Sequence, residues 1–414
     1  MKYISHAFVL FTGLFSSAQS FATNCIIDAV FQKNEKWNSY SIDIKELENS
    51  RQANIKRMLP SINIGVGQYI QNNQWLTDIS ESNLHLSLSY DFLSGFETIK
   101  ENDRLDVVKR LKYIELLYAR NDYIINLFSK IVDYKAKKSQ IKLMREQYKK
   151  LEKEYESTKE QAFLGIVSTL DVDIRSNVLN RMKLDIETLE EELNISFKKI
   201  FAEYHIPKEM LLNITYDKLK ACKIYDFQSL LKENNKWRLL ANTIDYDIKK
   251  ISDYPSFYLS LGMMPKKGGA LKDFSFKEMD YNASLGITFP LMRIFDTSEN
   301  QKTQAMHISQ IHNEYIRESI KLDILHKEIF TKLTLLKKRI PILEDELNLK
   351  KKKKEVEYIH ERIKSKQDTI LNYLSSINSL YETETTIQRV EYDIEYYSLY
   401  LYFLRQCDTY KRHV

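Results

Sequence analysis

The sequence at residues 60–67 is PSINIGVG, and the sequence at residues 255–262 is PSFYLSLG. Both stretches begin with Pro-Ser and end with glycine, and apolar residues alternate with polar or small ones between these ends. Alternation with a period of two residues predicts a β-strand that has one apolar face. The two stretches stand about 200 residues apart, which indicates the internal duplication of a large structural unit.

A second alternating run follows each of these stretches. Residues 84–92 read LHLSLSYDF, and residues 281–289 read YNASLGITF. We therefore predict strands at about 60–71 and 83–93 in the first copy, and at about 255–264 and 281–290 in the second copy. Runs of about 9–11 residues have the length of a tilted strand that spans a membrane. One apolar and one polar face are typical of a membrane β-barrel, although a soluble antiparallel sheet packed on helices shows the same alternation.

The chain between and after the strand pairs is nearly free of glycine and proline, which favours long helices. Apolar residues at a spacing of three and four, such as Leu111, Ile114, Tyr118 and Ile125, predict a packing face along residues 97–161. A helix of about 65 residues is ~97 Å long and has to run beside neighbours in an elongated bundle. We predict helical hairpins at about 97–204 and 293–406. The fold class is therefore mainly α with a small β part.

The first helical hairpin has a clear turn in residues 163–172, which read FLGIVSTLDV. Gly165 supplies the turn conformation, and Ser168 or Thr169 caps the next helix. Asp171 lies in the first turn of that helix, where a carboxylate complements the helix dipole. The corresponding turn of the second copy is expected near residues 364–368.

The N-terminal residues predict export. Lys2 precedes a short apolar run at residues 8–15, and Ser20-Phe21-Ala22 fits a signal peptidase site, so residues 1–22 are expected to be a signal peptide. Cys25, Cys222 and Cys407 allow at most one disulfide bond in an oxidising compartment, and their pairing stays open.

The charges give no indication of a nucleic-acid partner. The chain has 62 Lys and Arg against 57 Asp and Glu, a formal net charge of +5, and these charges are spread along the whole sequence. The sequence has no phosphate-binding glycine loop, nucleophile elbow, dinucleotide fingerprint or His-Glu-x-x-His motif. We therefore expect no enzyme activity, no cofactor and no metal site.

With these features together, the sequence resembles the TolC-like outer-membrane factor family over nearly all of residues 23–414. The resemblance rests on the duplicated order of short helix, two strands, long helix, turn and helix. It also rests on Leu59-Pro60 before the first strand and on the pattern Phe163-x-Gly165-x-x-Ser168-x-x-Asp171-Val172. The duplication then divides the chain into a first repeat at 23–210 and a second repeat at 211–414.

The resemblance implies a homotrimer in which four strands per subunit form one 12-stranded outer-membrane β-barrel. It further implies a trimeric α-helical barrel in the periplasm that contacts a periplasmic adaptor, also called a membrane fusion protein, and an inner-membrane pump. The function that the resemblance implies is a passive exit duct, driven by its inner-membrane partner, in a tripartite efflux pump or a type I secretion system.

The resemblance also implies roles for single residues. The hairpin tips are expected to dock the adaptor or to narrow the duct. They contain Leu164, Gly165, Ser168 and Asp171 in the first copy and Lys366, Asp368 and Asn372 in the second. For Asp171 a plain helix-dipole role is an equal alternative, and for Asp368 and Asn372 a structural role is the favoured one. Pro60 and Pro255 mark the starts of the first strand of each pair.

A physical argument supports oligomerisation without the resemblance. Four strands cannot close a barrel, and open sheet edges cannot face lipid because their backbone groups would lack hydrogen bonds. Bacterial barrels begin at about eight strands. The alternative function is a periplasmic coiled-coil adaptor or scaffold without a membrane barrel. Two hairpins and little other β-structure favour the duct.

Overall fold

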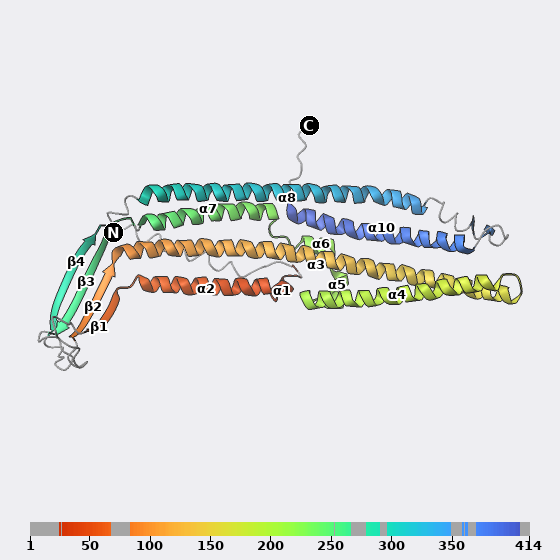
Figure 1. Ribbon diagram of the computed structural model, residues 1–414, viewed down its shortest axis with the longest axis horizontal. Coiled ribbons are helices and arrows are strands. Elements are labelled where there is room, and N and C mark those ends of the chain that lie inside the picture. The colour runs from red at the N-terminus through yellow and green to blue at the C-terminus, as the bar shows by residue number, and fades with distance from the viewer. Residues whose placement is uncertain are drawn as a thin grey trace, which may run out of the picture. The chain divides into compact units, whose positions relative to one another are not determined.

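The structure is a computed structural model, which describes residues 25, 27–67, 83–251, 253–265, 279–289, 296–348, 358–359, 361–362 and 370–405. The expected signal peptide at residues 1–22 lies outside these residues, as do the expected second turn near residues 364–368 and Cys407. Figure 1 shows the described elements along the chain.

The chain alternates long helices with short strands, so that the predicted fold class, mainly α with a small β part, is confirmed. The first half contains α1 (Asp28–Phe31), α2 (Glu35–Arg57), β1 (Ser61–Gly67), β2 (Asn83–Asp91), α3 (Phe92–Phe163) and α4 (Thr169–Tyr204). The short helices α5 (Lys208–Asn213) and α6 (Tyr216–Lys220) lead to the second half. The second half contains α7 (Phe227–Ile251), β3 (Ser256–Pro265), β4 (Met279–Thr288), α8 (Asp296–Asn348) and α10 (Ile370–Leu404).

These elements form two compact units, each of which combines segments from both halves of the chain. Unit 1 consists of Met1–Trp37, Leu117–Leu230 and Ser319–Val414. Unit 2 consists of Asn38–Leu116 and Leu231–Glu318. The sheet therefore belongs to unit 2. Helices α4 and α10 belong to unit 1, whereas the N-terminal parts of α3 and α8 belong to unit 2 and their C-terminal parts to unit 1.

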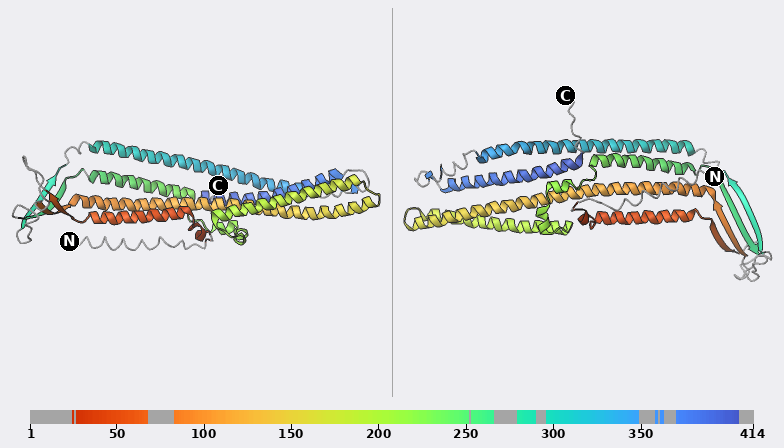
Figure 2. Two further views of the ribbon diagram at one scale, coloured as in Figure 1. Left: turned by 60° about the horizontal axis from the view of Figure 1, so that its bottom comes forward. Right: turned by 180° about the vertical axis from the view of Figure 1, so that it is seen from behind.

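The sheet of unit 2 has four antiparallel strands in the order β1-β2-β3-β4. Its central pair joins the two copies of the duplication, since β2 from the first half pairs with β3 from the second. Both views in Figure 2 show the four strands side by side. Every neighbouring pair is antiparallel, with Ile62 opposite Leu88, Leu88 opposite Leu261, and Leu261 opposite Ala283.

The helices of unit 2 lie beside one another with ion pairs between them. The guanidinium of Arg51 on α2 lies 3.2 Å from the Asp106 carboxylate on α3, and that of Arg104 on α3 lies 2.7 Å from Asp245 on α7. The side chains of these pairs are about a third to a half exposed, so each pair contributes little to stability.

The core of unit 1 includes the middle of α3. Ile124, Phe128 and Ile131 are completely buried there. The predicted apolar stripe is thus confirmed as a packing face, and α4 and α10 lie along it in Figures 1 and 2. The helix α3 has 72 residues, which corresponds to a length of ~108 Å.

Helix α3 begins at Phe92, earlier than the predicted start near residue 97, because the chain passes directly from β2 into the helix. The Ser94 hydroxyl donates a hydrogen bond of 2.6 Å to the Asp91 carbonyl at this junction. Gly95 lies inside the helix, where a single glycine costs only about 1 kcal/mol relative to alanine. Pro341 lies inside α8, which continues to Asn348.

Candidate functional site

The apolar face of the sheet in unit 2 is exposed. The side chains of Ile64 on β1 and Leu285 on β4 are 72% and 75% exposed, and Tyr281 is 71% exposed. No described part of the chain covers these side chains. Exposed apolar patches on a folded protein mark sites of contact with lipid or with another protein, so this face is a candidate contact surface.

The opposite face of the sheet is polar and carries a row of serines. In the register of the strands, Ser61 lies opposite Ser89, Ser89 opposite Ser260, and Ser260 opposite Ser284. The hydroxyl oxygens of Ser61 and Ser89 are 2.6 Å apart. The two faces of the sheet therefore suit two different media, one apolar and one aqueous.

The glycines of the strands make room for side chains from the neighbouring strand on this polar face. A Cβ atom at Gly262 would lie 2.0 Å from Oδ1 of Asn282, and one at Gly286 would lie 2.2 Å from Cζ of Tyr258. Asn282 and Tyr258 each lie directly opposite the glycine that they cover. The small residues seen in the sequence pattern thus leave room for this cross-strand packing.

Both outer strands of the sheet have an open edge. Among the described residues, β1 pairs only with β2 and β4 pairs only with β3. Pro60 immediately precedes β1 and Pro255 immediately precedes β3, so both prolines stand where a missing N–H does not interrupt the ladder. An open edge presents unpaired backbone groups that are able to pair with another chain.

The tip of the first helical hairpin is a capped turn with an apolar surface. Gly165 has a φ of +70°, and its amide donates to the Ala162 carbonyl at the end of α3. The Ser168 hydroxyl accepts a hydrogen bond of 3.1 Å from the Leu170 amide and thereby caps α4. Asp171 lies in the first turn of α4. The exposed apolar side chains of this tip are Phe163, Leu164, Ile166 and Leu170.

A carboxylate near this tip binds two helices to α3. Glu154 on α3 accepts a hydrogen bond of 2.6 Å from the Tyr373 hydroxyl on α10, and it lies 3.2 Å from the Arg175 guanidinium on α4. Burial is the main cause of a raised pKa at Tyr373, and the hydrogen bond to Glu154 raises this pKa further. The phenol therefore remains protonated and donates a hydrogen bond.

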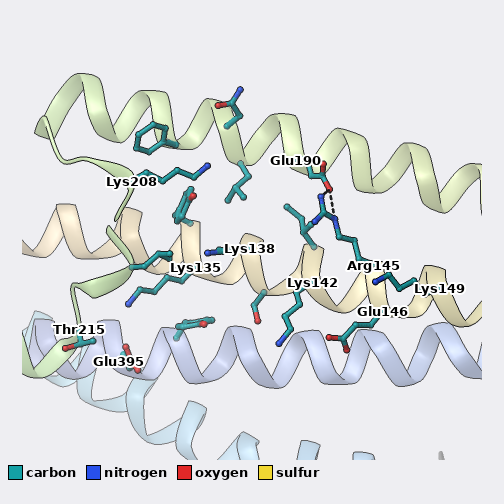
Figure 3. A pocket seen from close by; sticks show the side chains of 18 residues that line it. Lys135, Lys138, Lys142, Arg145, Glu146, Lys149, Glu190, Lys208, Thr215 and Glu395 are labelled. Atoms are coloured by element: carbon teal, nitrogen blue, oxygen red, sulfur yellow. Dashed lines mark hydrogen bonds and ion pairs between the residues drawn. The ribbon is translucent and has the colours of Figure 1, made fainter. Parts of the chain in front are cut away.

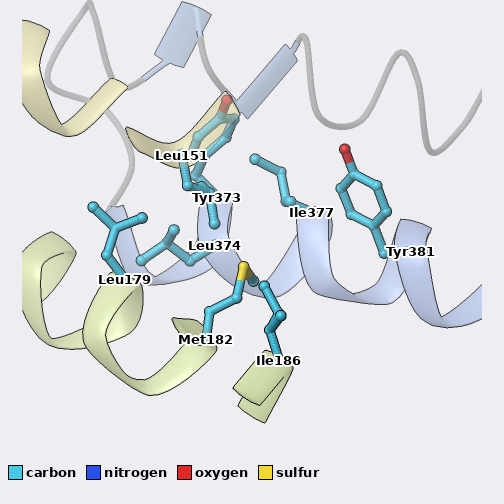
Figure 4. Packing of buried hydrophobic residues seen from close by; sticks show 8 residues of the cluster. All are labelled: Leu151, Leu179, Met182, Ile186, Tyr373, Leu374, Ile377 and Tyr381. Atoms are coloured by element: carbon cyan, nitrogen blue, oxygen red, sulfur yellow. The ribbon is translucent and has the colours of Figure 1, made fainter. Parts of the chain in front are cut away.

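The same three helices form an apolar cluster that includes Tyr373, the hydrogen-bond donor to this carboxylate. Figure 4 shows a cluster in which Leu179 and Met182 of α4 face Leu374 and Ile377 of α10. Asn372, one of the expected tip residues, is exposed and precedes Tyr373 on α10. Lys366 and Asp368, the other expected tip residues of the second copy, lie outside the described residues.

The N-terminal segment of unit 1 is fixed by a disulfide and a buried ion pair. The disulfide joins Cys25 to Cys222, with a Cα–Cα distance of 4.9 Å, and resolves the pairing that the sequence left open. Arg120 on α3 is completely buried, and its Nη2 lies 2.7 Å from Oδ1 of Asp28. Its Nη1 donates a hydrogen bond of 2.8 Å to the Cys222 carbonyl. Cys25 and Asp28 are thus held to the segment that joins the two halves of the chain and to α3, respectively.

The sequence patterns missed these buried polar groups, although one of them left a signal. Arg120 and Asn121 interrupt the apolar spacing of α3 between Leu117 and Ile124, which placed two polar side chains on the predicted packing face. Glu154 and Tyr373 left no such signal, because their partners are distant in sequence.

No described helix is long and apolar enough to serve as a membrane span. The described residues also contain no group of three or more His, Cys, Asp or Glu side chains that could hold a metal ion.

Comparison with solved structures identifies the fold. The outer membrane protein VceC from Vibrio cholerae matches with a TM-score of 0.68 at 13% identity, over 91% of this chain and 93% of that chain. The outer membrane channel CmeC from Campylobacter jejuni matches with a TM-score of 0.69 at 12% identity, over 91% of this chain and 84% of that one.

The open state of the outer membrane channel MtrE from Neisseria gonorrhoeae also has a TM-score of 0.69 at 12% identity, with coverages of 91% and 87%. No protein-family model and no curated protein matches the sequence. The chain has the fold of these outer-membrane channels, which is the fold that its resemblance to the TolC-like outer-membrane factors implies.

Proposed function

We propose that this protein is a subunit of an outer-membrane channel that serves as the exit duct of a tripartite efflux pump or a type I secretion system. The observation that carries the proposal is the sheet of unit 2, whose apolar face is exposed while its opposite face is polar. Such a sheet is suited to a wall between lipid and water.

The open edges of the sheet support assembly from several copies. In lipid, every backbone N–H and C=O needs a partner within the protein, so β1 of one subunit has to pair with β4 of another. The resemblance to the TolC-like family adds the number of copies, which is three, and hence a 12-stranded barrel. The solved structures with this fold include proteins described as outer-membrane channels.

The helical hairpins are proposed to form the periplasmic part of the duct. In this arrangement the first tip, with Leu164, Gly165, Ser168 and Asp171, contacts the periplasmic adaptor or narrows the duct. Its exposed apolar side chains support contact with another protein, because a tip of this kind gains stability when it is covered. Asn372, Lys366 and Asp368 are proposed for the second tip by the resemblance alone.

The proposed duct is passive, and an inner-membrane pump supplies the energy. A passive duct needs no catalytic site. This role is consistent with the solved proteins of the same fold that are described as channels. The alternative, a periplasmic adaptor or scaffold, would leave the apolar face of the sheet in water, which the exposure of Ile64 and Leu285 disfavours.

Planar-bilayer recording on the oligomer purified from outer membranes tests this proposal. We expect stepwise conductance from an oligomer that migrates as a trimer without heating and as a monomer after boiling. The same preparation, boiled before addition, serves as the control and should give no steps. A folded oligomer without conductance, or a monomer in the soluble periplasmic fraction, would contradict the proposed function.

A further inference from the structure

A groove of about 930 Å³ lies in unit 1 between α3, α4, α10 and the segment that follows α4. This volume is in the range of sites that hold small organic molecules. Figure 3 shows α3 between α4 and α10, with the side chains of the groove coming from these helices and from the segment that follows α4. Neither the proposed channel function nor the resemblance assigns a role to this groove.

The groove has a strong excess of positive charge. Five cations come from the same helix, α3, and a sixth comes from α5; only three carboxylates, Glu146, Glu190 and Glu395, line the groove with them. The cations are Lys135, Lys138, Lys142, Arg145, Lys149 and Lys208.

The six positive charges outnumber the carboxylates that line the groove by three. Arg145 is paired with Glu190, and the Lys135 ammonium donates a hydrogen bond of 2.7 Å to the Ile214 carbonyl. Within the described part of the chain, Lys138, Lys142 and Lys149 have no ion-pair partner. Like charges three or four residues apart destabilise a helix, so this spacing on α3 carries a cost that a bound anion would remove.

The wall of the groove behind these cations is apolar and aromatic. Tyr134 and Ile141 are almost fully buried, while Phe197 and Tyr392 are partly exposed. Burial also lowers the pKa of Lys135, since its ammonium lies where water is partly excluded. An ordinary solvated lysine face has no such wall. Here the cations line a groove in which the partly exposed rings of Phe197 and Tyr392 offer apolar contact area to the same ligand.

We propose that this groove binds an organic anion that carries two or more acidic groups on an apolar frame. The acidic groups contact Lys138 and Lys142 on α3 and Lys208 on α5, and the frame contacts the apolar wall. The charge of the acidic groups selects the ligand, and the frame distinguishes it from inorganic ions. This inference is independent of the proposed channel function, because it requires only the local packing of unit 1.

The probe for the test is 1,3,6,8-pyrenetetrasulfonate, whose fluorescence anisotropy is followed with the purified full-length protein in an uncharged detergent. The probe has fixed negative charges and an aromatic frame. We expect a saturable isotherm with one site per chain that weakens as salt is added. Binding without saturation would contradict a defined site.

The decisive variant is Lys138→Glu/Lys142→Glu. We expect it to weaken probe binding at least tenfold, because it turns two attractive charge contacts into repulsive ones. The matched control is Lys153→Glu/Lys159→Glu, which reverses two exposed lysines on the same helix outside the groove. The control should bind the probe within about twofold of wild type, because salt screens distant charges.

Two further measurements separate the site from general charge attraction. Lys208→Glu reverses a charge on a different element, α5, and should weaken binding about threefold. Inorganic pyrophosphate should displace the probe only at much higher concentration, because it cannot contact the apolar wall. Equal losses in the Lys138/Lys142 and Lys153/Lys159 variants, or equal affinity for pyrophosphate and the probe, would overturn the proposal. Circular dichroism and oligomer migration establish that each variant is folded.

Discussion

Replacing Leu285 by lysine tests which medium the apolar face of the sheet contacts. Leu285 lies in β4 and is 75% exposed, so its replacement removes few contacts within the subunit. If this face lies in water, the change should alter the free energy of unfolding by no more than about 0.5 kcal/mol. If the face lies in lipid, a lysine near the middle of the bilayer costs about 2–4 kcal/mol per subunit. In a trimer this amounts to about 6–12 kcal/mol per assembly.

The matched control is Ser284→Lys, one residue earlier in the same strand. Ser284 points to the opposite, polar face, where it lies opposite Ser260. A charged side chain there remains in water, so we expect a much smaller loss of stability than for Leu285→Lys. The assay is guanidinium unfolding of the protein in lipid vesicles, combined with the fraction of oligomer that resists detergent without heating. Equal behaviour of the two variants would refute the assignment of the apolar face to lipid.

Three further predictions concern unit 1. Replacing Cys25 and Cys222 by serine should lower the free energy of unfolding by up to about 5 kcal/mol, because the disulfide spans a separation of 197 residues. The double variant should have the same urea midpoint as wild-type protein under reducing conditions. A double variant with the urea midpoint of oxidised wild-type protein would contradict this prediction. Replacing Arg120 by methionine should lower the free energy of unfolding, measured by heat or urea, by about 3–5 kcal/mol, because Asp28 is then a buried charge that has lost this cation. Adding Asp28→Asn to the same variant should restore part of the lost stability. Replacing Tyr373 by phenylalanine removes a hydrogen bond to the charged Glu154 and should cost about 1.5–3 kcal/mol, visible as faster amide exchange at the start of α10 and unchanged exchange in α7.

Much of the fold was predictable because its signals are local. The alternation in residues 60–67 and 255–262 marks strands within a single run, and glycine and proline confine the breaks of the helices to a few windows. A cap at Ser168 or Thr169 was likewise predictable, since a hydroxyl residue before a helix start is a local motif, and the structure has Ser168 in this position. The predicted start of α3 was a few residues late, because a strand that runs straight into a helix leaves no turn residues to mark the boundary.

The contacts between distant segments were not predictable. The serine row from Ser61 to Ser284 depends on the register of three strand pairs, and a shift by one residue in any pair would destroy it. The contact between Glu154 and Tyr373 joins residues that stand 219 positions apart. The cysteine pairing stayed open because three cysteines alone do not specify a partner. These features depend on how the helices pack, which no local pattern in one sequence specifies.

The most direct test of the account is amide hydrogen exchange of the oligomer in lipid nanodiscs, resolved for the four strands. The central claim is that β1 and β4 complete the sheet with other copies of the chain. We therefore predict that the amides of β1 and β4 are protected as strongly as those of β2 and β3. Rapid exchange along the outer edges of β1 and β4, with protection confined to β2 and β3, would show that each sheet keeps its open edges and would contradict the shared barrel.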